Sequence, residues 1–194
     1  MSGFVGHLGN NLSGAWAIMR GQPEGLSRLD LSLDGFWRSF GAIVLLAPFA
    51  MLALLSQRRL AAAAGEATVA TSSAGLGLEA IGLLLDWLAF PLVFALLARP
   101  LGLSGRYVAF IVARNWGAVL ISAMVAVVHA AHLTGLLPSQ FAPSLLFIAV
   151  GFALRFSYVI TRTALGVPFG VALPIVALDF LLSLTIWATI DRFA

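Results

Sequence analysis

The sequence predicts an all-α fold, a polytopic membrane helical bundle with about five transmembrane helices and an N-terminal amphipathic helix. Two observations predict it. Of the 194 residues, 61% are hydrophobic and 10% are charged, whereas soluble domains carry about 25% charged residues. The apolar residues also form five runs as long as the roughly 20 residues with which a helix crosses a hydrocarbon core. This composition excludes an ordinary soluble enzyme, a disordered chain and a nucleic-acid-binding domain.

The five runs give the expected transmembrane helices. The start of the third is ambiguous, since the span either includes Arg114 and Asn115 or begins at Trp116 and leaves them at the interface. We favour the longer span, with Arg114 near the membrane edge, where its long side chain reaches water. The expected spans cover residues 36–55, 76–97, 108–131, 144–163 and 167–190.

The residues before the first span form a separate segment, so the expected domains are a cytoplasmic amphipathic segment at 1–35 and the five-span bundle at 36–194. In the segment, large apolar side chains recur every four residues, which lays them along one side of a helix. We predict that this stripe contacts the membrane interface or a partner protein, and the alternative is that it packs against the protein's own bundle. The stripe consists of Phe4, Leu8, Leu12 and Trp16.

The arginines orient the bundle. All eleven basic residues are arginine, and they are scattered instead of forming the patch that nucleic acids require. Arginine without lysine is typical of a GC-rich bacterial genome. A cytoplasmic N-terminus places seven arginines inside and three outside, as the positive-inside rule favours. We therefore expect a protein of the bacterial inner membrane with its N-terminus in the cytoplasm and its C-terminus outside, although Arg58 and Arg59 oppose this orientation.

Two local signals mark the ends of the first span. Asp34 is the expected N-cap at its start, because a short side-chain oxygen can accept a hydrogen bond from a free backbone N–H. The stretch at 61–73 is rich in Ala, Thr and Ser and predicts an external loop.

Four ionisable residues lie within the expected spans, where each is energetically costly and needs a reason. At 1.5 Å per residue, the two acids lie about 16 Å from the cytoplasmic end, and the two arginines about 9 and 12 Å. Pairs between Asp179 and Arg155 and between Asp86 and Arg114 are feasible, and so is the exchange of partners. The pairs either hold helices together or form a polar path for a proton, an ion or a head group. This intramembrane polar network comprises Asp86, Arg114, Arg155 and Asp179.

A weaker pattern concerns metal binding. His129 and His132 are three residues apart on one helix face, and Glu79 lies near the same end of the bundle. Two histidines and a carboxylate resemble a zinc ligand set, but without a fixed third ligand the pattern is weak. The chain has no cysteine and no nucleophile, phosphate-loop or metalloprotease motif. We therefore expect no metal, no cofactor and no enzymatic activity.

The layout resembles the Yip domain family, five-span membrane proteins with a cytoplasmic N-terminal segment. The resemblance lies in FPLVFALLARPLGLSGRYVAFIVARNWGAVL at 90–120 and in FSYVITRTALGVPFGVALPIVALDFLL at 156–182. The residues ARNW at 113–116 differ from the Gly-Tyr-type step followed by Pro that the family has there. The resemblance implies a small helical bundle with an accessory or scaffolding role, and it carries over no catalytic residue.

The predicted membrane bundle leaves two hypotheses for the function of the protein. The leading hypothesis is a non-enzymatic accessory, scaffold or assembly subunit of a larger membrane complex, in contact with the lipid bilayer and other membrane protein subunits and not with nucleic acid. The alternative is a small oligomeric transporter or channel that uses the buried Asp and Arg residues. Self-association remains open in both hypotheses.

Overall fold

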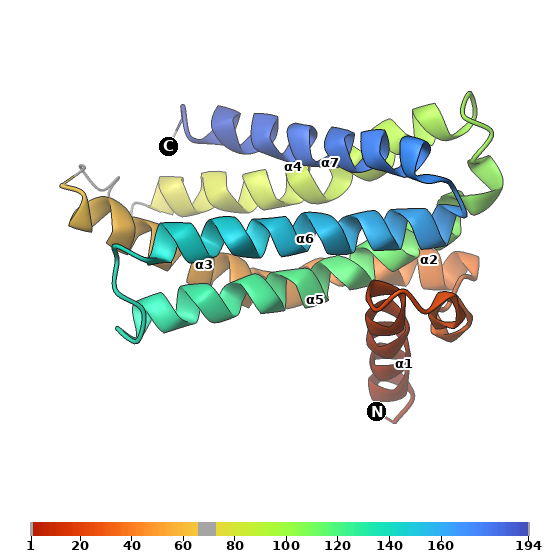
Figure 1. The fold of residues 1–194 in the computed structure, drawn as a ribbon, viewed down its shortest axis with the longest axis horizontal. Coiled ribbons are helices and arrows are strands. Elements are labelled where there is room, and N and C mark those ends of the chain that lie inside the picture. Colours follow the sequence, from red (N-terminus) through yellow and green to blue (C-terminus); the bar gives the residue numbers. More distant parts are fainter. Residues whose placement is uncertain (1, 66–72, 194) are drawn as a thin grey trace.

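The computed structural model describes residues 2–65 and 73–193, with side chains described from 6 to 65 and from 75 to 193. Within these ranges every regular element is a helix, which confirms the all-α prediction (Figure 1). The elements are α1 (Ser2–Met19), the short 3-10 helix η1 (Pro23–Arg28), α2 (Leu33–Phe40), α3 (Ile43–Ala63), α4 (Ser73–Ala98), the 3-10 turn η2 (Ser104–Arg106), α5 (Tyr107–Leu133), α6 (Ala142–Leu165) and α7 (Phe169–Ile190).

The described residues contain five helical segments long and apolar enough to cross a membrane, and each matches one of the expected spans. The first joins α2 and α3 across a short break at Gly41. Helix α5 begins at Tyr107 and includes Arg114 and Asn115, and the position at which it enters the membrane stays a prediction. The protein is thus a multi-pass helical membrane bundle.

The long helices pack around α5. Helix α5 lies against α3 on one side and α6 on the other, whereas α4 packs mainly against α7. One end of the bundle holds α1, α2 and the α4–α5 and α6–α7 connections, and the other holds the α5–α6 connection and the C-terminus (Figure 1). We call these the N-terminal and the C-terminal end.

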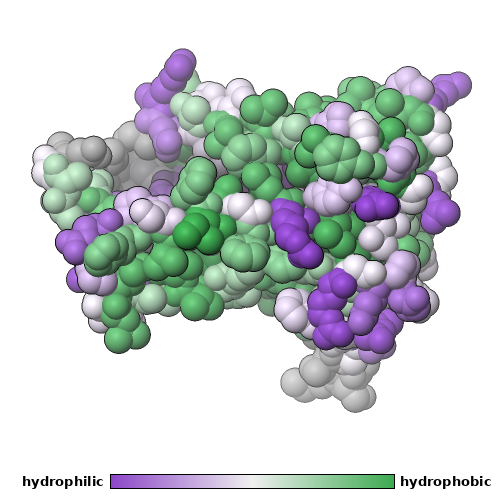
Figure 2. Space-filling model, in the orientation of Figure 1, coloured by the Kyte–Doolittle hydropathy of each residue, from purple (hydrophilic) through white to green (hydrophobic). Residues whose placement is uncertain are grey.

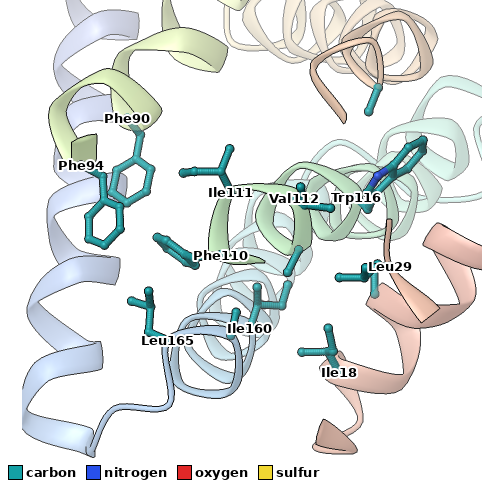
Figure 3. Close-up of a cluster of buried hydrophobic side chains, with 14 of the residues drawn as sticks. Ile18, Leu29, Phe90, Phe94, Phe110, Ile111, Val112, Trp116, Ile160 and Leu165 are labelled. Atoms are coloured by element: carbon teal, nitrogen blue, oxygen red, sulfur yellow. The ribbon is translucent and has the colours of Figure 1, made fainter. Parts of the chain in front are cut away.

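An aromatic cluster joins α4 to α5 near the N-terminal end. Phe94 of α4 meets Phe110 of α5 edge to face, with ring centroids 4.9 Å apart, a favoured geometry for two aromatic rings. Figure 3 shows Phe90 beside Phe94, and both are almost fully buried. The Tyr107 hydroxyl donates a hydrogen bond to the Pro91 carbonyl at 2.9 Å. This end of the bundle is therefore tightly packed.

The outer surface is apolar, as lipid contact requires. Hydrophobic side chains cover most of the middle of the face in Figure 2, and hydrophilic ones gather mainly toward its ends. On α4 the large outward side chains are leucine and isoleucine: Leu76, Ile81, Leu84, Leu85, Leu88, Leu92 and Leu96.

Helix α1 runs across the direction of the long helices at the N-terminal end (Figure 1). Its face toward the protein contains Asn11, Ala15 and Ile18, which are at most 1% exposed and pack toward α5 and α6. Of the predicted stripe, Leu8 and Leu12 pack partly against the core, whereas Trp16 is 48% exposed. The Phe4 side chain lies outside the described residues. Helix α1 thus packs on the protein's own bundle and leaves Trp16 free, and contact of the stripe with lipid or a partner stays a prediction.

Polar contacts fix α1 to the segment that leads into α2. The buried Asn11 side chain accepts a hydrogen bond from the Asp30 backbone N–H at 3.1 Å and donates one to the His7 carbonyl at 2.8 Å. The Ser32 hydroxyl and backbone N–H donate hydrogen bonds to Asp30 and thereby hold its pKa below the usual range. Ser32, and not the expected Asp34, is the N-cap of α2, because its hydroxyl accepts a hydrogen bond from the Gly35 N–H at 3.0 Å. The loop expected at 61–73 begins later, since α3 continues to Ala63, and residues 66–72 lie outside the described residues.

A close backbone contact between α1 and η1 gives a testable prediction. A Cβ added at Gly25 would lie 2.5 Å from the Gly14 carbonyl oxygen and 2.9 Å from the Ile18 nitrogen, both of them backbone atoms. We expect Gly25→Ala to weaken the docking of α1 by about 1–3 kcal/mol, the usual cost of overpacking. Trypsin should then cleave faster at Arg20. Gly9→Ala, on α1 with no described atom within 4 Å of its added Cβ, is the matched control; equal cleavage of both variants would contradict this account.

Candidate functional site

An ion pair lies inside the bundle between α5 and α7. Arg114 donates two hydrogen bonds to Asp179, from Nε to Oδ2 at 3.0 Å and from Nη2 to Oδ1 at 2.8 Å. Two parallel bonds of this kind match the planar fork of the guanidinium to the carboxylate and make the pair both strong and directional. The side chains are 16% and 25% exposed. Arg114 also lies over the Phe90 ring, 4.8 Å from its centroid. The guanidinium thus makes a cation–π contact in addition to its hydrogen bonds with the carboxylate.

The remaining nitrogen of Arg114 is not used by this pair. Nη1 is buried and has no hydrogen-bond partner in the described part of the chain. An unpaired buried donor costs free energy, so this atom marks a place where a water molecule or a solute would be stabilised.

Asp86 of α4 completes the polar cluster. It lines two cavities that Arg114 also lines, one of about 280 Å³ and one of about 270 Å³. No ion pair of Asp86 occurs among the described residues, because the bonded partner of Arg114 is Asp179. Asp86 lies about 18 Å along α4 from Ala98 at 1.5 Å per residue, which is near the middle of a hydrocarbon core about 30 Å thick.

The two cavities lie on opposite sides of the cluster. The first lies between α5, α6 and α7 and contains Asp179 and Ser183, whereas the second lies between α3, α4 and α5. Small side chains make this space: Ala118 and Ser122 of α5 line both cavities, and Ala50 and Ala53 face the second from α3. Helices α4 and α5 also make few contacts with each other apart from the aromatic cluster. The cluster therefore has space for water or a small solute on both sides.

A third cavity continues toward the C-terminal end. It has a volume of about 550 Å³ and shares Ala50, Ala53 and Leu83 with the second cavity. Its polar wall is acidic, with Glu79 of α4 and Asp191, which follows α7. The three cavities form a series from this acidic end to the Asp86–Arg114–Asp179 cluster.

Comparison with protein-family models, curated proteins and solved structures found no match. The resemblance to the Yip domain family therefore stays a prediction.

Arg155 does not join the cluster. Its side chain is exposed on α6, and its guanidinium lies 5.5 Å from the centroid of the Phe156 ring. Of the pairings left open by the sequence, the structure contains Arg114 with Asp179, which belongs to the exchanged set of partners, and the described residues contain no pair of Asp179 with Arg155. Arg114 itself points inward to α7 and not to the membrane edge, because Asp179 neutralises it there.

The histidines have a different place. Ser56 Oγ of α3 lies 3.0 Å from His132 Nδ1, and His132 Nε2 lies 3.1 Å from Ser139 Oγ in the α5–α6 connection. Arg59 donates hydrogen bonds to the last carbonyls of α5, at His132 and Leu133, where a cation also complements the helix dipole. His129 instead lines the second cavity, and Glu79 lines the third. The residues of the weak metal candidate are thus spread over separate places, and the described residues contain no group of three or more metal-ligating side chains.

We expect His132→Ala to lower the free energy of unfolding by about 1–3 kcal/mol, because Ser56 then keeps a buried hydroxyl without its partner. Thermal unfolding in detergent measures this loss, with Thr134→Ala at the exposed end of α5 as the control. Added zinc should leave the unfolding midpoint of the wild type unchanged. A rise with zinc would contradict the hydrogen-bonding role and favour a metal site.

The sequence missed the residues that shape the cavities. Ser122 and Ser183 are small polar residues within apolar spans. The sequence could have indicated them only because each hydroxyl lies in the same expected span as a charged residue, Arg114 or Asp179. It also missed Asn115, which is fully buried and donates a hydrogen bond to the Ser39 hydroxyl of α2 at 3.0 Å.

Proposed function

We propose that the protein is a small membrane transporter or channel in which the Asp86–Arg114–Asp179 cluster contacts the moving solute. One observation carries the proposal: a charged cluster near mid-span borders a cavity on each side. Charged groups at this depth are retained where they face a water-filled space or a partner charge; this cluster has a partner charge and borders cavities large enough for water. An ion pair that serves only to hold helices together needs no cavity beside it.

The proposed setting is the bacterial inner membrane, with the N-terminus in the cytoplasm and the C-terminus outside. The positive-inside distribution of arginine supports this orientation. Arg59, which opposed it, is engaged in hydrogen bonds to the end of α5 and therefore has a structural reason for its position.

Access of water to the cluster is the deciding measurement. The natural chain has no cysteine, so single cysteines can be introduced without a background. We expect Ser122→Cys and Ser183→Cys, which line the cavities, to react with a charged methanethiosulfonate reagent in membrane vesicles. Leu85→Cys is the matched control, because Leu85 neighbours Asp86 at the same depth but is 50% exposed on the outer surface of α4, where lipid excludes the reagent.

Reaction of the cavity cysteines without reaction at position 85 supports the proposal. Equal protection at all three positions contradicts it and leaves the cluster as a contact that only holds helices together.

A second candidate is the accessory or scaffold subunit. The observation that favours it is Arg155, an exposed arginine about 15 Å along α6 from Leu165. An unpaired arginine at this depth is costly, and a partner helix with a carboxylate would neutralise it. Mild-detergent purification from the native membrane tests this candidate: one stoichiometric membrane partner, lost from the Arg155→Leu variant, supports it, whereas a homo-oligomer without a partner counts against it.

A further inference from the structure

The cluster has an imbalance of charge. Arg114 and Asp179 neutralise each other through two hydrogen bonds. Asp86 shares the cavities with them, and Arg114 is the one arginine that lines either cavity in the described part of the chain; the imidazole of His129 on α5 lines the second cavity as well. When Asp86 is ionised, the cluster therefore carries one excess negative charge near the middle of the membrane, which is costly unless a positive charge accompanies it.

The surroundings of Asp86 favour a proton over a metal cation as that positive charge. A metal cation is held by several oxygen ligands, six or more for calcium and magnesium, whereas a proton needs one carboxylate oxygen. The described residues contain no group of three or more metal-ligating side chains. Apart from the cluster itself, the polar side chains that line the first cavity are hydroxyls, those of Ser122, Ser157, Thr161 and Ser183, and the other lining residues are apolar. The hydroxyl of Thr161, on the same wall, already donates a hydrogen bond to the Ser157 carbonyl at 2.8 Å.

The acidic end of the cavity series gives the proton a route. Glu79 and Asp191 line the third cavity, which adjoins the second cavity through shared walls, and the second contains Asp86. Carboxylates at the mouth attract cations and exchange protons with water. The third cavity thus holds Glu79 and Asp191, and the adjoining second cavity holds His129 and Asp86, with Asp86 beside the ion pair.

We infer that Asp86 is a proton-binding site and that the solute class of the proposed transporter includes protons, which enter from the C-terminal end past Glu79. This inference rests on the proposed function. In the step itself, a hydronium ion gives a proton to one carboxylate oxygen of Asp86: an O–H bond of hydronium breaks, the O–H bond of the neutral carboxylic acid forms, and a water molecule is left; release reverses this. Asp179 keeps its bonds to Arg114 throughout.

Infrared difference spectroscopy of the reconstituted protein tests the inference directly. Between two pH values, protonation of a carboxylate in an apolar site adds the carbonyl stretch of a neutral carboxylic acid. We expect such a band in the wild type and its loss in Asp86→Asn. Asp34→Asn is the control, since it removes an exposed carboxylate at the opposite end of the bundle by the same chemical change; thermal unfolding and size exclusion verify that both variants are folded.

Proton flux provides the second measurement. In liposomes with a trapped pH-sensitive dye and a potassium diffusion potential, we expect flux with the wild type and the Asp34→Asn variant, loss of flux to the protein-free level with Asp86→Asn, and slower flux with Glu79→Gln. A wild type without a band assigned to Asp86, or a flux that sodium or potassium carries in place of protons, overturns the inference. Reactive cavity cysteines in that same case leave the proposed transporter intact, so the two failures are distinguishable.

Discussion

Replacement of Arg114 by leucine is expected to lower the free energy of unfolding by about 3–5 kcal/mol, the usual cost of removing one partner from a buried ion pair. The variant leaves Asp179 and Asp86 in one apolar site without the guanidinium that holds two hydrogen bonds to Asp179. It also removes the cation from the face of the Phe90 ring. Unfolding in mixed detergent micelles, followed by the loss of helical circular dichroism, measures the change.

Arg155→Leu is the matched control for this prediction. It makes the same substitution within a membrane span, but at an exposed side chain that the described residues do not pair with a carboxylate. We expect no loss of stability, because the substitution removes an unpaired charge from an apolar span and breaks no ion pair. If the two leucine variants lost equal stability, the Arg114–Asp179 pair would have no special role in the fold.

The membrane fold was predictable because its signal is a bulk property of the sequence. Apolar runs of sufficient length place the spans without knowledge of how they pack, and the few charged residues within them stand out against that background. For the same reason Asp86, Arg114 and Asp179 could be selected as a polar network from the sequence alone.

The partners within the network were not predictable, because depth along a helix does not give its rotation. Ala149 and Ile160 of α6 are buried, and Arg155 lies roughly 120–140° around the helix from each at about 100° per residue. Arg155 thus faces away from Asp179. The sequence hides this, since apolar residues surround a membrane helix on all sides and leave no amphipathic face to mark its inner side.

The inner face of α1 was predictable only in part: Leu8 and Leu12 of the stripe pack against the core, whereas Trp16 is exposed. Under the alternative that α1 packs on the bundle, the stripe of large apolar side chains predicts that this side of α1 faces the protein. Where α1 meets η1 at Gly25, however, the two backbones are so close that only small residues of α1 fit between them. Gly14 therefore lies against η1 and Ala15 is fully buried, whereas Trp16, one position after Ala15, is rotated out by about 100°. Small residues at a close helix contact carry little hydrophobicity, so a hydropathy pattern does not reveal them.

Removal of both charges distinguishes a structural ion pair from a functional one. In the double variant Arg114→Met with Asp179→Leu, two apolar side chains of similar volume replace the pair, so neither member of the ion pair is left without the other. Such replacements are often neutral or stabilising by about 1–4 kcal/mol. We therefore expect the double variant to unfold at or above the wild-type free energy, in contrast to the large loss in Arg114→Leu. Because the two sites are in contact, their effects should not add.

The same double variant is expected to lose proton flux in the liposome assay, although its fold is intact. Asp86 then has no neighbouring Arg114 to stabilise its ionised form, and apolar side chains replace the polar walls that Arg114 and Asp179 provide to the cavities. Stability and flux thus change in opposite directions only if the pair serves the solute. A double variant that is stable and still conducts at the wild-type rate would show that the ion pair only joins α5 to α7. Flux would then have to depend on Asp86 alone, which the Asp86→Asn variant measures separately.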